Sequence, residues 1–156
     1  MRIEEKIGIY SKSVLDNGLT VVSEQVSGMG SFSTGICINV GSRDDEISGI
    51  SHFMEHAAFR RTKKRTSTQI ANGFESLGAY SNAFTTKELT CFYVRAINQH
   101  FKKTFEILAD ITLNTVFVKE EIEKEKLIIL EEIKSYEDDV EEYVFDFADK
   151  VVFGEH

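Results

Sequence analysis

The sequence has no proline and only two cysteines, Cys37 and Cys91, among its 156 residues. Two cysteines cannot supply the disulfide framework of a small secreted domain, so a reducing compartment is expected. Both cysteines lie in apolar stretches that are typical of strands, which predicts buried structural thiols rather than reactive ones. The absence of proline has no functional explanation in the sequence.

Long apolar runs and a basic surface are missing as well. No apolar run approaches the roughly 18 residues that a membrane helix needs. The early acids at the N-terminus, with no apolar core after them, predict neither a secretory signal nor a mitochondrial transit peptide. The net charge of −8 disfavours nucleic acid and anionic membranes as partners, because both need a basic face. We therefore expect no membrane span and no nucleic-acid binding.

The chain does contain enough apolar material for a core, since 42% of its residues are hydrophobic. Asn17-Gly18 lies between β-branched stretches and predicts a hairpin of strands at 10–15 and 19–25. Apolar and polar residues alternate over 31–40, which predicts a further strand. The other expected elements are helices at 47–59, 67–77, 98–113, 119–136 and 140–152, and strands at 79–85 and 88–97. Paired strands and blocks of helices predict an α+β fold, an antiparallel or mixed sheet with helices packed on it.

Residues 52–56 read His-Phe-Met-Glu-His and lie within the expected helix at 47–59. At roughly 100° per residue, His56 lies about 40° round the helix from His52, and Glu55 about 60° to the other side. The three side chains therefore leave one face, as two metal-binding imidazoles with a carboxylate beside them require. Two ordinary histidines are the simpler interpretation, but chance gives this pattern in only about one chain in a hundred of this composition. We expect a zinc site of the reversed, or inverzincin, order.

A catalytic zinc ion needs a third protein ligand, with the fourth position left to water. His100 and His156 are poor candidates, because the first begins an expected helix and the second is the last residue. Cys91 is possible in principle. Its neighbours two residues away on either side, Leu89 and Tyr93, indicate a core thiol instead.

The acidic helix expected at 119–136 offers better candidates. Residues 127–130 are apolar all round, so the middle of this helix is expected to be buried. Either Glu131 or Glu132 must then lie near the interior. Glu125 shares a face with Glu132, because the two are nearly two helical turns apart. The pattern does not choose between Glu131 and Glu132.

A set of short segments lies along the chain in a fixed order. They are Leu15-Asp16-Asn17-Gly18-Leu19, Val40-Gly41-Ser42-Arg43-Asp44, Gly49-Ile50-Ser51-His52-Phe53-Met54-Glu55-His56, Asn82-Ala83-Phe84-Thr85, Glu125 to Ile133, and Tyr136-Glu137-Asp138-Asp139. Taken together and in this order, these segments resemble the peptidase M16 family, the group of pitrilysin, insulysin and the mitochondrial processing peptidase. The resemblance is closest to the processing-peptidase branch and covers nearly all of the chain. It implies a zinc metalloendopeptidase that cleaves peptides or presequences, and we expect it in the cytoplasm of a bacterium.

The resemblance also implies roles for individual residues. It makes Glu132 the third zinc ligand beside His52 and His56, and so settles the choice that the pattern leaves open. Glu55 is implied as the general base that takes a proton from the zinc-activated water. Glu125 is implied to support the metal site by orienting a ligand.

The strand at 79–85 is implied to bind the substrate. Asn82, Ala83 and Phe84 fall where the family presents a strand edge to a peptide. A peptide substrate would then add to the sheet, main chain to main chain.

The chain departs from the family pattern in two ways. A loop that commonly reads Lys-Gly-Thr is here Arg60-Arg61-Thr62, which we interpret as solvated. Family members also carry further domains and enclose the substrate between two halves. We therefore expect residues 1–156 to be a single N-terminal zinc-binding domain, truncated from a longer chain. Its activity is expected to need a second M16 half, in the same chain or in a partner subunit.

Two other interpretations stay open. A non-catalytic M16-like subunit would bind or scaffold without cleaving, or the fragment would be inactive without its missing half. Such subunits typically have a degraded motif, whereas this one is intact. S-ribosylhomocysteine lyase also has a His-x-x-Glu-His helix, but its third ligand is a cysteine, and the sequence around Cys91 does not resemble it.

Overall fold

The computed structural model describes residues 3–7, 10–138 and 140–154. Its contacts divide the chain into two compact units, Met1–Gly30 and Ser31–His156. All of the candidate site residues lie in the second unit, so the prediction of a metal-binding domain depends on that unit. None of the described helices combines the length and the apolar character that crossing a bilayer requires.

The first unit is a three-stranded antiparallel sheet. Its strands are β1 (Ile3–Ile7), β2 (Tyr10–Val14) and β3 (Thr20–Glu24), in the order β1-β2-β3. The expected hairpin is confirmed, because β2 and β3 pair across the turn at Asn17 and Gly18. Gly18 has a φ of 87°, which a residue without a Cβ adopts readily. The strand β1 was not predicted from the sequence.

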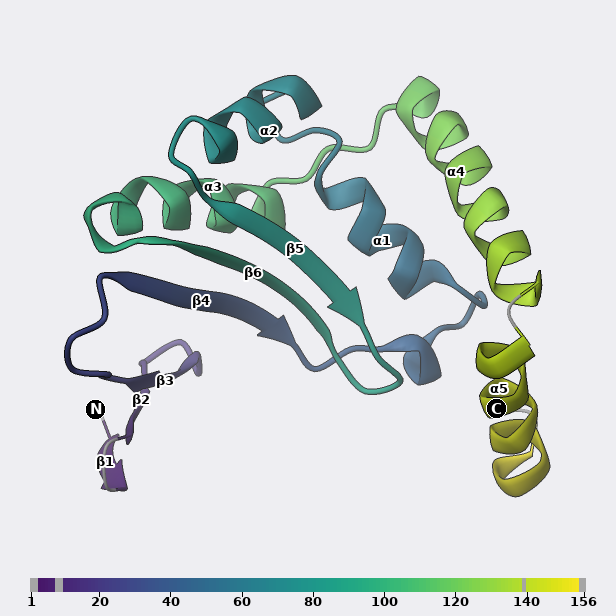
Figure 1. Ribbon diagram of the computed structural model, residues 1–156, viewed down its shortest axis with the longest axis horizontal. Coiled ribbons are helices and arrows are strands. Elements are labelled where there is room, and N and C mark those ends of the chain that lie inside the picture. Colours follow the sequence, from purple (N-terminus) through teal and green to yellow (C-terminus); the bar gives the residue numbers. More distant parts are fainter. Residues whose placement is uncertain (1–2, 8–9, 139, 155–156) are drawn as a thin grey trace. The chain divides into compact units, whose positions relative to one another are not determined.

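The second unit is built on another three-stranded antiparallel sheet. Its strands are β4 (Ser31–Ile38), β5 (Tyr80–Thr85) and β6 (Thr90–Ile97), in the order β4-β6-β5. The helices are α1 (Ile50–Ala58), α2 (Ser67–Glu75), α3 (Phe101–Leu113), α4 (Lys119–Asp138) and α5 (Val140–Phe153) (Figure 1). Short 3-10 turns cover Ser42–Asp44 and Asn98–His100. The expected α+β class is confirmed.

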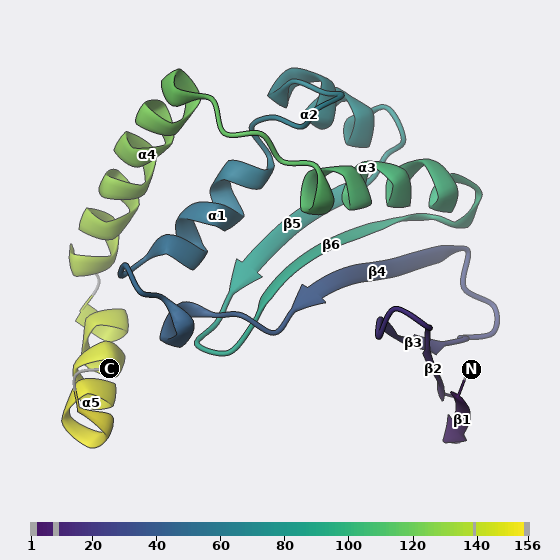
Figure 2. The same ribbon diagram turned by 180° about the vertical axis from the view of Figure 1, so that it is seen from behind.

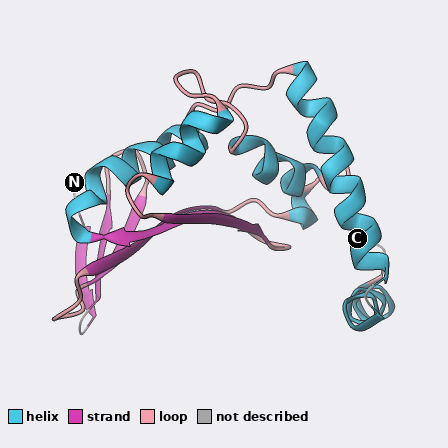
Figure 3. Ribbon diagram, turned by 45° about the horizontal axis from the view of Figure 1, so that its top comes forward, coloured by secondary structure: helices cyan, strands magenta, loops and turns pink. Residues whose placement is uncertain are grey.

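Helices cover one face of this sheet and form the core with it. Figure 2 shows α2 and α3 over the strands and α1 beside them, and Figure 3 shows helices on one side of the sheet with the C-terminal helices farther from it. In β6 the side chains of Phe92 and Val94 are buried under the helices, while Arg95 between Val94 and Ala96 is exposed. This alternation is the period-two pattern of a half-buried strand. The core residues are Ala58, Ile70, Phe74, Ala83, Phe92, Val94, Ile107, Leu108 and Ile111.

The helix α1 begins at Ile50, three residues later than the sequence predicts. Gly49 before it is left-handed, with a φ of 82°, so the helix cannot extend further back. The carboxylate of Asp45 accepts hydrogen bonds from the Ser51 N–H at 3.2 Å and from the Ser51 hydroxyl at 2.5 Å. Asp45 therefore accepts a hydrogen bond from the Ser51 N–H in the first turn of α1, which has no acceptor within the helix. Its negative charge also interacts favourably with the positive end of the helix dipole.

The expectation of two buried free thiols is wrong. Cys37 of β4 lies directly opposite Cys91 of β6 in the antiparallel register, and the two form a disulfide. Cys91 is buried, but Cys37 is exposed on the face of the sheet away from the core. The sequence could not show this pairing, because it depends on the register of two strands separated by four other elements.

Candidate metal centre

Two helices that are far apart in the sequence bring the candidate residues together. α1 and α4 lie side by side in both views (Figures 1 and 2). α1 carries His52, Glu55 and His56 on one face, and α4 carries Glu125 and Glu132 on the face toward α1. The helical spacing of these residues places each set on the face of its helix that meets the other helix. All five residues expected from the sequence therefore lie around one point.

The donor atoms of His52, His56 and Glu132 lie within 4.8 Å of one another. The two Nε2 atoms are 3.1 Å apart. The Glu132 carboxylate oxygens lie 3.7 Å from Nε2 of His52 and 3.3 Å from Nε2 of His56. Ligand atoms about 2.0–2.2 Å from a tetrahedral ion are about 3.3–3.6 Å apart. The spacing and the two-imidazole, one-carboxylate donor set therefore fit a divalent metal with one position left open.

Glu125 holds His56 from behind this cluster. Its Oε1 accepts a hydrogen bond of 2.9 Å from Nδ1 of His56, and its side chain is 2% exposed. Nδ1 is then the protonated nitrogen, so the lone pair of Nε2 points toward His52 and Glu132. This arrangement orients the imidazole as a metal ligand needs.

The charge of Glu125 is balanced by a cation. Arg60 donates a hydrogen bond of 3.0 Å from Nη2 to Oε1 and forms an ion pair with the other carboxylate oxygen. Burial alone would raise the pKa of Glu125, but the hydrogen bonds from Arg60 and His56 outweigh it and lower the pKa. Glu125 is therefore a buried carboxylate that stays ionised.

Glu55 lies on the same face of α1 as His52 and His56 and is hydrogen-bonded to the sheet. Its Oε2 accepts a hydrogen bond of 2.5 Å from the hydroxyl of Thr85, the last residue of β5. Glu55 is half-buried, between α1 and the end of this strand. Sequence reasoning did not assign a role to Thr85, although it follows Asn82-Ala83-Phe84 directly.

The three residues expected to bind substrate occupy the edge strand β5, which pairs only with β6 among the described strands. Ala83 is buried in the core, while the side chains of Asn82 and Phe84 are exposed on the other face. The Ala83 N–H donates a hydrogen bond of 2.9 Å to Oδ1 of Asn82. Asn82 therefore covers a main-chain donor that a peptide strand could use.

The interpretation of the loop after α1 as solvated is wrong. Arg61 donates from Nε to the Glu121 carboxylate at 3.0 and 3.1 Å, and from Nη2 at 2.6 Å. This hydrogen bonding raises the pKa of Arg61 above its usual value. Arg60 and Arg61 thus both reach across to α4, and neither points freely into solvent.

The same loop is anchored to α3 by a buried carboxylate. Asp110 accepts hydrogen bonds from the Thr62 hydroxyl at 2.7 Å and from Asn114 at 3.0 Å, and pairs with Arg65. Burial alone would raise the pKa of Asp110, but these donors together lower it. The segment that follows the His-Phe-Met-Glu-His helix is therefore held at both ends.

The expectation that the middle of α4 is buried is also wrong. Leu127 is 65% exposed and Leu130 is 52% exposed, because α4 contacts its neighbour α1 along one face only. Ile122 and Ile129 are half-buried on that face, together with Glu132. Of the α4 side chains that the structure describes, Glu125 alone is fully buried.

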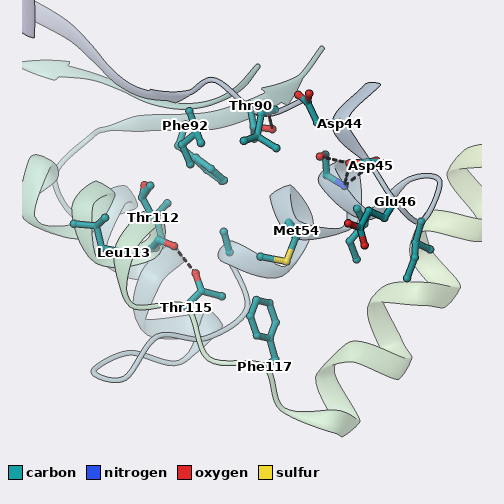
Figure 4. Close-up of a pocket in the computed structure, with 17 residues that line it drawn as sticks. Asp44, Asp45, Glu46, Met54, Thr90, Phe92, Thr112, Leu113, Thr115 and Phe117 are labelled. Carbon is teal, nitrogen blue, oxygen red and sulfur yellow. Dashed lines mark hydrogen bonds between the residues drawn. The ribbon is translucent and has the colours of Figure 1, made fainter. Parts of the chain in front are cut away.

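An apolar cavity of about 680 Å³ lies on the face of α1 opposite to the one that carries His52, Glu55 and His56. Figure 4 shows Met54 and Phe117 pointing into it, with Asp44, Asp45 and Glu46 at one side. None of the metal-binding candidates lines it. The cavity is therefore separate from the metal centre.

Comparison with known proteins agrees with this geometry. Residues 20–155 match a family model described as insulinase (peptidase family M16). An uncharacterized zinc protease of Bacillus subtilis, YmxG, is 39% identical over 142 residues, which is 90% of this chain and 35% of that protein. The mitochondrial-processing peptidase subunit beta of Mus musculus is 40% identical over 135 residues, 85% of this chain and 27% of that protein.

Among solved structures, a protease from Helicobacter pylori superposes with a TM-score of 0.77 at 27% sequence identity. The match covers 83% of this chain and 32% of that chain. The chain thus spans about a third of the length of these proteins.

Proposed function

Because this chain belongs to the insulinase family of peptidases, M16, we propose that it is the metal-binding part of a zinc metalloendopeptidase. In this proposal His52, His56 and Glu132 hold Zn²⁺, and Glu55 is the general base. The observation that carries it is the convergence of three donor atoms from two distant helices to within 4.8 Å. The names of the relatives, zinc proteases and a processing peptidase, support the same activity.

Bound zinc would lower the pKa of a coordinated water to about 7 and polarise a peptide carbonyl. The side chains of this chain supply the rest. Glu55 is fixed through Oε2 by the Thr85 hydroxyl, so its Oε1 can take a proton from the attacking water and return it to the leaving amine. Glu125 keeps His56 in the tautomer whose Nε2 is a ligand.

The substrate in this proposal is a peptide, added as an extra strand to β5. Asn82 and Phe84 would contact its side chains, and Ala83 would contribute its main chain. The Ala83 N–H is held by Asn82 at 2.9 Å, so the Asn82 side chain would turn away when a peptide binds. Peptides in general or targeting presequences are both compatible with main-chain recognition.

Hydrolysis in this proposal needs a second M16 half, in the same chain or in a partner subunit. The chain spans about a third of its relatives, so the remaining two thirds would supply the other wall of the site. The isolated chain would then bind zinc and peptide without rapid turnover. A non-catalytic subunit would behave in the same way even with the second half present.

The test separates metal binding from catalysis. The Glu55→Gln variant is expected to retain the zinc stoichiometry of the wild type and to lose peptide cleavage in the full-length protein. Glu131→Gln, on the exposed side of α4, is the matched control and should cleave normally. Near-wild-type turnover by Glu55→Gln would exclude Glu55 as the base. Zinc binding without cleavage by the wild-type full-length protein would favour the non-catalytic alternative.

A further inference from the structure

Two consecutive arginines join α1 to α4 outside the group of metal-binding candidates. Arg60 pairs with Glu125, and Arg61 places both Nε and Nη2 on the carboxylate of Glu121. Glu121 and Glu125 are four residues apart, so they occupy adjacent turns on one face of α4. The loop after α1 therefore forms ion pairs with α4 at two positions, one turn apart.

Two contacts along a helix restrict both its position and its tilt, whereas one contact restricts its position alone. A single ion pair at Glu125 would hold α4 against α1 but would leave its tilt free. Glu132 is seven residues beyond Glu125, about 10.5 Å along the helix axis. A tilt of only about 10° around Glu125 would move Glu132 by nearly 2 Å, whereas metal ligands tolerate about 0.2 Å.

Of the apolar side chains along α4 that the structure describes, only Ile122 and Ile129 are half-buried on the face toward α1. The side chains of Leu127, Ile128, Leu130 and Ile133 are all about half exposed or more. The loop, in contrast, is itself rigidly held, because Thr62 and Arg65 are bound to the buried Asp110 of α3. Because this loop is fixed to α3, the pair of Arg61 with Glu121 fixes the first turns of α4 relative to α1 and α3.

We propose that Arg61 is a positioning residue for the metal centre: its two-pronged pair with Glu121 sets the tilt of α4 so that Glu132 reaches His52 and His56. This inference rests on the proposed metal site. It concerns a feature of this chain in particular, because a glycine at position 61, as in the common Lys-Gly-Thr loop, could make no such pair. Arg61 touches neither the metal ligands nor Glu55, so it acts through the helix.

The test measures the affinity of the metal-free full-length protein for Co²⁺, and binding is monitored by the visible absorption of the bound ion. Arg61→Ala and Glu121→Gln are each expected to weaken Co²⁺ binding by about three- to tenfold, the range for a partly buried two-pronged ion pair. The double variant should bind no more weakly than either single variant, because each removes the same contact. Arg61→Lys should fall between Arg61→Ala and the wild type, since it retains the charge and loses the fork.

Lys63→Ala is the matched control, because it removes an equal charge from an exposed position of the same loop. It should bind Co²⁺ like the wild type. The inference is overturned if Arg61→Ala, shown to be folded by circular dichroism, binds within twofold of the wild type. Equal weakening by Lys63→Ala, or additive losses in the double variant, would overturn it as well. A wild-type chain that binds no Co²⁺ would instead overturn the proposed metal site itself.

Discussion

The hydroxyl of Thr85 donates a hydrogen bond of 2.5 Å to the carboxylate of Glu55, and so joins the end of β5 to the middle of α1. The strand proposed to receive the peptide thereby also orients the proposed general base. A carboxylate held through one oxygen presents the other in a defined direction. In the proposed function, this hydrogen bond would therefore link the position of a bound peptide to the orientation of Glu55.

Replacing Thr85 by valine should slow peptide cleavage by the full-length protein by about tenfold or more, the cost typical of losing a hydrogen bond that orients a site residue. The volume of the side chain is nearly unchanged, so the β5 strand should remain in place. Zinc affinity should not change, because Thr85 contacts none of the three metal-binding candidates. Steady-state kinetics and zinc titration of the same preparation measure the two effects.

Thr85→Ser is the control for this variant. It retains the hydroxyl and should restore most of the rate. A Thr85→Val enzyme with wild-type kcat, or a Thr85→Ser enzyme as slow as Thr85→Val, would show that the hydrogen bond to Glu55 is not used in catalysis.

Substitution of Glu132 by glutamine should weaken zinc binding by more than the roughly 10- to 100-fold that the loss of an outer-shell partner costs. The same change at Glu131 should have little effect, because Glu131 is exposed and paired with Lys134 at 2.6 Å. Competition with a chromophoric chelator measures both affinities. The opposite ranking would move the third ligand by one residue along α4.

Periodicity explains which parts of this centre the sequence could predict. The helix that carries His52, Glu55 and His56 follows from their spacing, because an α-helix repeats every 3.6 residues wherever it lies. Glu125 and Glu132 share a face for the same reason. The resemblance to the M16 family then chose Glu132 over its neighbour, and the structure brings that side chain to the two imidazoles.

Contacts between distant elements were the parts that the sequence did not reveal. The bond from Thr85 to Glu55 and the fork of Arg61 on Glu121 depend on how β5 and α4 approach α1. A run of arginines is compatible with a solvated loop until a partner helix is placed beside it. The exposed middle of α4 has the same origin, since apolar sequence alone does not say how many neighbours a helix has.

Removal of the metal should destabilise the fold. A ligand that binds only the folded state at 100 times its Kd adds about 2.7 kcal/mol to the free energy of unfolding. For a chain of this size that corresponds to a fall in Tm of about 5–10 °C when a chelator is added. Differential scanning calorimetry with and without zinc measures it. A His52→Ala variant should show no such difference, and an equal shift in that variant would point to binding elsewhere.

Gly41 is expected to be intolerant of a side chain. A Cβ at this position would lie 2.5 Å from the backbone nitrogen of Glu88, in the turn between β5 and β6. The backbone cannot yield easily, because Ser42 N–H bonds to the Thr86 carbonyl at 3.0 Å. Gly41→Ala should therefore lower the free energy of unfolding by about 1–3 kcal/mol, measured in urea. Gly30→Ala, with open space around the new Cβ, should be neutral or slightly stabilising, and similar losses in both variants would contradict the steric argument.

The buried carboxylate of Asp110 should make stability depend on pH in a defined direction. Its pKa is lowered in the folded chain by hydrogen bonds from Thr62, Arg65 and Asn114, which outweigh burial. The unfolded chain, with an aspartate pKa of about 3.9, therefore binds more protons than the folded chain as the pH falls through this range. The stabilisation is fully present above about pH 5 and is lost as the pH falls toward the folded pKa.

Asp110→Asn isolates this contribution. At pH 7 the variant should be less stable than the wild type by about 2–4 kcal/mol, because it removes a charged acceptor from several buried donors. The difference should shrink as the pH is lowered from 6 to about 3, since the unfolded wild-type chain then binds a proton at this aspartate while the folded carboxylate, whose pKa is lowered, still resists protonation. Urea unfolding at a series of pH values measures it, with Glu106→Gln on the exposed side of α3 as the control. A difference that stays constant over this range would mean that Asp110 stabilises the loop by its shape and not by its charge.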